Sequence, residues 1–260
     1  MKKVLSEAIA EIRPDSKYEK EILKKASAII KEINFSLKNA KAVLGGSGAK
    51  GTWLKTFDAD IFVKFNYSKY NEKSDQLSDL LSTFLKKHYK ITRLHGSRDY
   101  FQIRESKFTF EIVPILEIRN AEQARNITDV SPLHSNFVKK HSKLVDEIRL
   151  TKQFFKAAKV YGAESYIRGF SGYVCEILTI NYGSFLKLIK VISKWKEKTT
   201  VDVKNYYKGK QIFMELNKSK LTSPIIVIDP VQKDRNAAAA LDHEKFEIIN
   251  HRAKEFLKKP

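Results

Sequence analysis

Residues 58–65, Asp-Ala-Asp-Ile-Phe-Val-Lys-Phe, alternate in polarity as a β-strand with one buried face does. Because a strand turns successive side chains to opposite faces, Asp58 and Asp60 share one face, while Ile61, Val63 and Phe65 enter a core on the other. Two carboxylates on one strand face repel each other unless a cation lies between them. Mg²⁺ is the natural candidate, since proteins bind it with a few carboxylates together with substrate phosphates. The run therefore predicts a strand that closes a core on one side and carries a metal site on the other.

A third carboxylate, Glu111, lies between the apolar residues Phe110 and Ile112 on another predicted strand. It shares a strand face with Thr109 and Val113. If the two strands are neighbours, three carboxylates converge on one patch. A D-x-D pair alone is most often a solvated strand face, so the metal-site interpretation depends on the combination.

A glycine-rich turn, Gly45-Gly46-Ser47-Gly48-Ala49-Lys50-Gly51, follows a short apolar strand predicted over residues 40–44. Backbone N–H groups exposed in such a turn, at the start of a helix, bind phosphate oxygens well. The turn has neither the G-K-[ST] ending of a Walker A motif nor the G-x-G-x-x-G spacing of a dinucleotide fingerprint. Placed shortly before the D-x-D pair, it predicts a two-metal phosphoryl-transfer site.

The hydrophobic periodicity predicts an α+β chain of two domains. The first, residues 1–125, is a mixed sheet with helices, and the second, residues 126–260, is mostly helical. The predicted helices cover residues 17–35, 73–88, 143–159, 172–182, 183–195 and 241–258, and the predicted strands cover residues 40–44, 58–65, 100–104, 108–113 and 225–228.

Charge and cysteine content restrict the partner and the compartment. With 49 Lys and Arg against 30 Asp and Glu, the formal net charge of +19 favours polyanions such as nucleic acids, and a lysine-rich solvated surface is the alternative. The single cysteine, Cys175, excludes an internal disulfide framework and a cysteine-rich zinc site. No apolar run approaches the roughly 20 residues that span a bilayer, and Met1-Lys2-Lys3-Val4 does not begin a signal peptide. We therefore expect a cytoplasmic protein with no membrane partner.

Several motifs in a fixed order carry a family resemblance. Gly46-Ser47, Thr52-Trp53-Leu54, Asp58-Ala59-Asp60 and the carboxylate before Val113-Pro114 resemble the palm of the polymerase-beta-type nucleotidyltransferases. Over roughly residues 16–258 the chain is similar, more narrowly, to the archaeal (class I) CCA-adding tRNA nucleotidyltransferases. The narrower resemblance rests on Ser131-Pro132-Leu133-His134, Lys152, Tyr161-Gly162-Ala163-Glu164, Arg168-Gly169-Phe170-Ser171-Gly172-Tyr173 with Glu176 and Leu178, Tyr182-Gly183-Ser184-Phe185, Asp229-Pro230-Val231 and Asp234-Arg235-Asn236.

The resemblance implies a polymerase-beta-like palm followed by a helical central domain that binds nucleotide and RNA. Asp58, Asp60 and Glu111 would hold two Mg²⁺ ions, one activating the RNA 3′-hydroxyl and one gripping the triphosphate. The reaction would be a template-independent, in-line attack of the tRNA acceptor end on the α-phosphate of CTP or ATP, releasing pyrophosphate. The nucleotide contacts that it implies are Gly46, Ser47 and Lys50 at the phosphates, Ser131, His134, Lys152 and Tyr161 at the triphosphate and sugar, and Arg235 near the base.

Without the resemblance, three of these residues have plainer interpretations. Lys152 is one lysine among many and would be a surface residue, Tyr161 would pack in a turn, and His134 would start a helix.

The sequence departs from the family at three points. The third carboxylate is Glu111 where the family has Asp, and a shift of about 1 Å from its extra methylene can cost roughly 10²-fold in rate. Lys50 stands where Arg is common, so the charge stays but bidentate phosphate binding is lost. The family continues into a C-terminal tail that holds the tRNA minihelix, whereas this sequence stops at Pro260. The two expectations are a tail supplied as a separately encoded subunit and an enzyme that measures its RNA without a tail, and a homodimer is the other candidate assembly.

Three functions therefore remain open on the sequence. The first is completion or repair of the tRNA CCA end, and the second is a relaxed-specificity terminal nucleotidyltransferase acting on other RNAs. The third is a non-catalytic RNA-binding subunit in which Glu111 has disabled the metal site.

Overall fold

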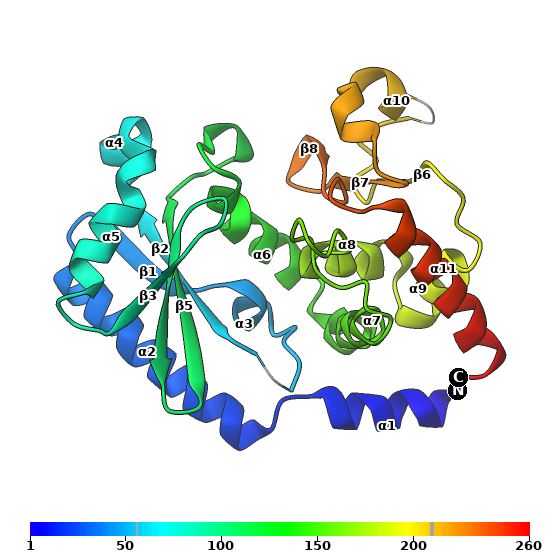
Figure 1. Ribbon diagram of the computed structural model, residues 1–260, viewed down its shortest axis with the longest axis horizontal. Helices are drawn as coiled ribbons and strands as arrows, with labels where there is room; N and C mark the ends of the chain where they lie inside the picture. The colour runs from blue at the N-terminus through cyan, green and yellow to red at the C-terminus, as the bar shows by residue number, and fades with distance from the viewer. Residues whose placement is uncertain (56, 209–210) are drawn as a thin grey trace. The chain divides into compact units, whose positions relative to one another are not determined.

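The computed structural model describes residues 1–55, 57–208 and 211–260. They form two compact units, which we describe one at a time (Figure 1). The sheet unit is Pro14–Lys139, and the helical unit combines Met1–Arg13 with Lys140–Pro260. Helices within the described ranges are too short or too polar to span a membrane.

The sheet unit is built on a mixed five-stranded sheet in the order β1-β2-β5-β4-β3. β2 and β5 are parallel, and the other neighbouring pairs are antiparallel. The bounds of its strands are β1 Ala40–Leu44, β2 Ala59–Phe65, β3 Ile91–Leu94, β4 Tyr100–Glu105 and β5 Phe108–Leu116, and those of its α-helices are α2 Ser16–Ser36, α3 Gly46–Lys50, α4 Tyr67–Tyr70, α5 Leu77–Leu85 and α6 Ser131–Lys139.

One face of this sheet carries the core. α2 contacts β1 and β2, and α5 contacts β5. Ile61 and Val63 of β2 and Ile112 of β5 are fully buried in the same apolar cluster as the inner sides of both helices. The predicted core face of the Asp58–Phe65 run is thereby confirmed, and its carboxylate face is left on the opposite side of the sheet.

The helical unit contains a smaller sheet of order β6-β7-β8. Its strands are β6 Thr199–Val201, β7 Ile225–Asp229 and β8 Gln232–Asn236, and its α-helices are α1 Lys2–Ile12, α7 Val145–Ala157, α8 Gly172–Tyr182, α9 Phe185–Ile192, α10 Ile212–Glu215 and α11 His243–Lys258.

The best-predicted helix is α8, whose observed bounds, Gly172–Tyr182, equal the predicted ones. Ser171 caps its N-terminus by accepting a hydrogen bond from the Val174 N–H, and Gly183 ends it in the left-handed conformation, with φ 78°. A serine before a helix and a glycine after it are the strongest local boundary signals. Both were visible in the sequence, which is why this prediction was accurate.

The division of the chain differs from the boundary predicted between residues 125 and 126. Val130 and the helix α6 stay with the sheet unit, because α6 packs on α3 and because Asp129 accepts a hydrogen bond from the Leu116 N–H at the end of β5. The first helix, α1, goes to the other unit, since it packs on α7 and Arg13 pairs with Asp146. Such contacts join segments that are distant in sequence, so periodicity could not reveal them.

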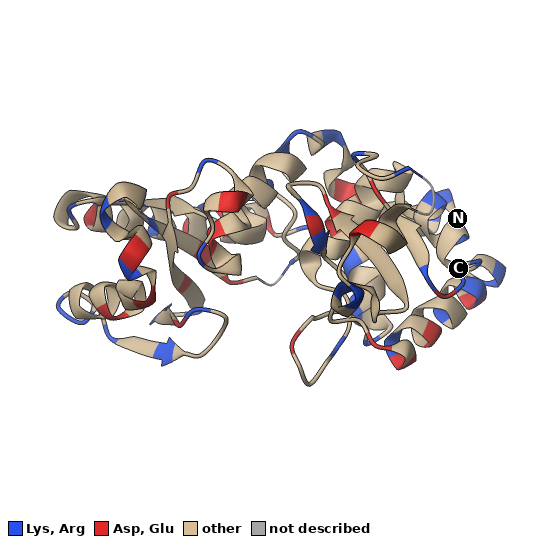
Figure 2. Ribbon diagram, turned by 90° about the horizontal axis from the view of Figure 1, so that it is seen from above, with Lys and Arg blue, Asp and Glu red and all other residues tan. Residues whose placement is uncertain are grey.

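Basic residues are distributed over helices and loops of both units and alternate with acidic ones (Figure 2). Many are held in ion pairs, such as Lys25 with Glu105 and Lys64 with Glu117. The net charge of +19 is therefore carried by the surface as a whole and is not confined to one helix.

Candidate active site

The polar face of the sheet brings two of the predicted carboxylates together. Asp60 on β2 and Glu111 on β5 are register partners in the parallel pair, so their side chains project from the same face of adjacent strands. Asp58 lies just before β2 begins and is exposed. The condition set by the sequence, that the two strands be neighbours, is met.

The glycine-rich turn lies directly over Asp60. The Gly45 N–H donates to the Asp60 carbonyl oxygen at 2.7 Å, which joins the start of the turn to β2. Gly46 has φ +50°, and a Cβ built on it would overlap the Asp60 carboxylate. Only glycine satisfies both the backbone conformation and this close approach. Ser47 and Lys50 follow within the short helix α3, so the backbone of the turn and the carboxylate form one surface.

The electrostatics of this face disfavour two neighbouring negative charges. Burial, reinforced by Glu111 and Asp58 and opposed by Lys50, raises the pKa of Asp60 to about 7. Burial also raises the pKa of Glu111, against a hydrogen bond of 3.0 Å that its carboxylate accepts from the Gln102 side chain on β4. A cation placed here would stabilise the ionised form of both carboxylates.

The donor set fits a hard divalent cation. Asp58, Asp60 and Glu111 supply only oxygen atoms, which is the ligand type that Mg²⁺ prefers. Within the ranges that the structure describes, no three carboxylate, imidazole or thiol groups are already gathered as a metal-ligand cluster. The donors are thus adjacent but not preassembled, and their roles as metal ligands stay predictions.

Ser131 and His134 lie in the first turn of α6, which packs on α3 and so on the helix that carries Ser47. The start of α6 is tied to the sheet through Asp129, a fully buried carboxylate paired with the buried Arg98. The sheet unit therefore holds the predicted phosphate-binding turn, the carboxylates and the Ser131–His134 segment, and α3 contacts both β2 and α6.

The other three predicted nucleotide contacts belong to the helical unit. Lys152 on α7 is buried, and its ammonium group donates to Glu176 of α8 at 2.7 Å. The interpretation of Lys152 as a surface lysine is therefore wrong. Nζ of Lys156 lies 5.1 Å from the centre of the Tyr161 ring. The Tyr161 hydroxyl lies close to Gly172, since a Cβ added to that glycine would be 2.6 Å from the hydroxyl oxygen.

Arg235 on β8 has a buried acidic partner. Its Nη1 donates at 2.7 Å to Asp229, which is fully buried at the end of β7. Tyr173 of α8 donates to the other Asp229 oxygen at 3.0 Å. Asp229, Tyr173 and Glu176 were noted in the sequence only as parts of motifs, and nothing in the local pattern indicated that they contact the predicted nucleotide-binding residues.

Gln102 is a further site residue that sequence reasoning missed. It is the register partner of Glu111 on the neighbouring strand β4, so it lies on the carboxylate face. Gln102 lies within a predicted strand, and alternation puts it on the same strand face as Arg104. Only the pairing of β4 with β5 shows that this face meets Glu111.

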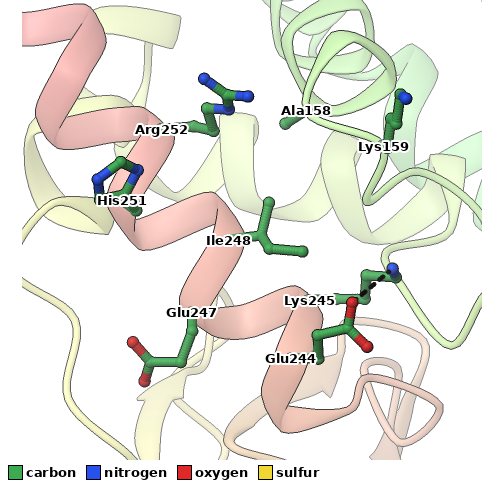
Figure 3. Close-up of a pocket in the computed structure, with 8 residues that line it drawn as sticks. All are labelled: Ala158, Lys159, Glu244, Lys245, Glu247, Ile248, His251 and Arg252. Carbon is green, nitrogen blue, oxygen red and sulfur yellow. Dashed lines mark hydrogen bonds and ion pairs between the residues drawn. The ribbon is translucent and has the colours of Figure 1, made fainter.

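A cavity of about 710 Å³ lies elsewhere in the helical unit, between the end of α7 and α11 (Figure 3). Ile248 points into it toward Ala158, and Lys159 and Lys245 lie on its rim. Several of its charged groups are already ion-paired, including Lys245 with Glu244 and Arg252 with Glu255. None of the residues predicted to bind nucleotide or metal lines this cavity.

Comparisons with known proteins find two family models and several curated relatives. Residues 1–132 match the family model described as the Second Messenger Oligonucleotide or Dinucleotide Synthetase domain, and residues 146–260 match the model of the tRNA nucleotidyltransferase, second domain. The chain is 46% identical over 209 residues to the CCA-adding enzyme of Nanoarchaeum equitans, covering 79% of this chain and 52% of that protein. It is 34% identical over 218 residues to the CCA-adding enzyme of Methanosarcina acetivorans, covering 83% of this chain and 46% of that protein.

Its fold is similar to that of a solved structure of Cid1, which is described as having RNA terminal uridylyl transferase activity. The TM-score is 0.74 at 12% identity, and the match covers 97% of this chain and 91% of that one. At this identity the likeness concerns the fold alone. The chain spans about half the length of the two curated relatives.

Proposed function

This chain belongs to the nucleotidyltransferase family that includes the archaeal CCA-adding enzymes, and from that membership we propose that it adds or restores the 3′-terminal CCA of tRNA from CTP and ATP. The observation that carries the proposal is the register pair Asp60–Glu111 beneath the Gly46 turn. It supports the proposal because acidic groups and backbone N–H groups suited to phosphate oxygens lie close together, as transfer of a nucleotidyl group requires. The tRNA acceptor end is the proposed partner, and the cytoplasm is the proposed compartment.

Each group in the sheet unit has a part in this reaction. Asp58, Asp60 and Glu111 would hold two Mg²⁺ ions. When bound, the ions would neutralise charge on the triphosphate and lower the pKa of the attacking 3′-hydroxyl. The backbone N–H groups at Gly46 and Ser47 would donate hydrogen bonds to the phosphate oxygens, and Lys50 would add positive charge. Gln102 would orient the Glu111 carboxylate through its hydrogen bond.

The groups of the sheet unit's last helix and of the helical unit would orient the nucleotide. Ser131 and His134 would contact the triphosphate and sugar, together with Lys152 and Tyr161. Arg235 would contact the base, where its planar guanidinium presents several donors in fixed directions.

The test is nucleotide incorporation by the purified chain with tRNA transcripts that end before CCA, with labelled CTP and ATP supplied separately and together. Ordered addition of C, C and A that requires Mg²⁺ would support the proposal. Asp58→Ala and Asp60→Ala should abolish incorporation, whereas Asp75→Asn, which changes an exposed acid elsewhere in the sheet unit, should leave it unchanged. Incorporation that persists in Asp60→Ala would overturn the assignment of the carboxylates.

The second function left open by the sequence, relaxed-specificity tailing of other RNAs, is tested by the same assay. Sequencing the products separates the two, because a relaxed transferase adds nucleotides of variable order and number. Absence of incorporation at every Mg²⁺ and Mn²⁺ concentration would favour the non-catalytic RNA-binding subunit, and Glu111→Asp would then test whether the longer side chain is the cause. A homodimer and a separate tail subunit stay predictions, which sedimentation of the chain with and without tRNA would check.

A further inference from the structure

Asp229 is a fully buried carboxylate whose two oxygens are both occupied. Oδ1 accepts from the Tyr173 hydroxyl at 3.0 Å and from the Val231 N–H at 3.0 Å. Oδ2 accepts from Nη1 of Arg235 at 2.7 Å. A buried charge is costly unless it is paired and hydrogen-bonded, and this one is held on both sides, so its orientation is fixed.

Arg235 differs from Asp229 in that it reaches the surface. Its side chain is 28% exposed on β8. Within the described residues, the hydrogen bond of the Arg235 guanidinium is the one that Nη1 donates to Asp229. Its Nε and Nη2 donors can therefore meet another acceptor. The bond to Asp229 therefore sets the plane in which these remaining donors point.

Tyr173 gives the pair a rigid support. It lies in the first turn of α8, two residues after the cap formed by Ser171, and its hydroxyl donates to Asp229. Burial and the neighbouring Asp229 raise the pKa of its phenol, so the hydroxyl remains a hydrogen-bond donor. Glu176, farther along α8, pairs with Lys152, so α8 supports both Lys152 and Arg235.

We propose that Asp229 and Tyr173 are positioning residues that hold the Arg235 guanidinium in the orientation that discriminates cytosine from adenine. This inference rests on the proposed function, because it concerns the base contact of that same site. Cytosine and adenine present their acceptors and amino groups at different places on the ring edge. A donor group fixed in one plane satisfies one edge better than the other, whereas a rotating one satisfies both poorly.

The test is a double-mutant cycle measured with two tRNA substrates, one that ends before CCA and takes CTP and one that ends in CC and takes ATP. Asp229→Asn keeps the shape but removes the charge, and Tyr173→Phe removes one hydrogen bond. We expect Asp229→Asn to lower the discrimination between CTP and ATP about tenfold, chiefly through KM, and Tyr173→Phe to do the same to a smaller extent. In the Arg235→Ala background, Asp229→Asn should cause no further loss of discrimination, since it acts through Arg235.

The matched control is Asp234→Asn, which changes an exposed acid on the strand that carries Arg235, its Oδ2 3.3 Å from Nζ of Lys220. It should leave discrimination unchanged. Losses from Asp229→Asn and Arg235→Ala that simply add, or a loss for both nucleotides with their ratio preserved, would overturn the inference in favour of a purely structural role.

Failure of the proposed function can be told apart from failure of this inference by equilibrium binding. If the unaltered chain incorporates no nucleotide, the proposed function fails, and binding of CTP, ATP and inorganic tripolyphosphate is compared instead. The inference then predicts that Asp229→Asn changes the ratio of CTP to ATP affinity and leaves tripolyphosphate affinity unchanged. An unchanged CTP to ATP ratio, or equal weakening of all three ligands, would overturn it.

Discussion

Gly46 is the residue on which the geometry of the carboxylate face most directly depends. Its φ of +50° and its contact with Asp60 exclude any side chain. Gly46→Ala should therefore lower nucleotide incorporation by about 100-fold or more, because it displaces a carboxylate by a distance comparable to a bond length. Gly51→Ala is the matched control, since Gly51 also has positive φ, +68°, but its Cβ would meet nothing within 4 Å. That variant should lose about 1 kcal/mol of stability and retain activity. Equal loss of activity in both variants would contradict the role given to Gly46.

Asp60 makes stability depend on pH in a direction that can be checked. Its pKa is raised to about 7, so its contribution to stability is present below the ordinary aspartate pKa of about 4 and is lost as the pH rises through 7. In the presence of EDTA, Asp60→Asn should therefore raise the free energy of unfolding at pH 8 by on the order of 1–3 kcal/mol and change it little near pH 4. Chemical denaturation at both pH values measures this. Asp75→Asn should show no such difference, and a destabilised Asp60→Asn protein at pH 8 would contradict the assignment.

The same titration couples to metal binding. Because a metal requires the ionised carboxylate, binding at Asp60 releases a proton below pH 7. Mg²⁺ affinity, measured by thermal stabilisation of the protein, should rise steeply from pH 5 to pH 7 and level off above it. A flat profile across this range would indicate that the metal does not contact Asp60.

At the scale of elements, the start of α6 is positioned by one buried ion pair. Asp129 pairs with Arg98 and also accepts the Leu116 N–H from β5. Asp129→Ala leaves Arg98 buried without its partner, so it should cost about 3–5 kcal/mol of unfolding free energy. Denaturant unfolding checks this against Asp79→Ala, which removes an exposed partner of Arg93 and should cost less than about 1 kcal/mol. Similar losses in the two variants would contradict the importance given to burial.

Elements with complete local signals were predicted well, and those without them were missed. Strands were predicted over residues 100–104 and 108–113, and the structure joins them as the antiparallel hairpin of β4 and β5, with Ser106 in the turn at φ 56°. β3 and β8 were not predicted, because β3 has only four residues and β8 is largely polar, and pairing with a neighbour makes them strands. α6 was not resolved as a separate helix, since Pro132 near its start reads equally well as a loop.

At the scale of the whole molecule, the net charge of +19 predicts how RNA binding responds to salt. The basic groups lie over both units (Figure 2), so many of them can contact RNA phosphates. Each such contact releases counterions from the RNA. Affinity for a tRNA minihelix that lacks CCA should fall by about tenfold or more between 50 and 200 mM salt. Filter binding or fluorescence anisotropy measures it. Affinity that changes little with salt would contradict an electrostatic contribution to RNA binding.

The sequence by itself determined the chemistry of the candidate site and the faces on which it lies. The alternation over residues 58–65 fixed which side of a strand carries Asp58 and Asp60, because side-chain direction on a strand is a local property. The glycines, the caps of α8 and the excess of basic residues are likewise local or additive features. Each could be interpreted without knowing what packs against it.

Only the tertiary structure decided which residues meet. The parallel pairing of β2 with β5 brings Asp60 to Glu111, β4 brings Gln102 to Glu111, and β7 brings Asp229 to Arg235. The packing of α1 with the helical unit and the burial of Lys152 against Glu176 likewise depend on contacts between distant segments. The physical reason is that strand register and ion pairing join positions far apart in the chain, and their free energy depends on burial, which no local pattern of residues specifies.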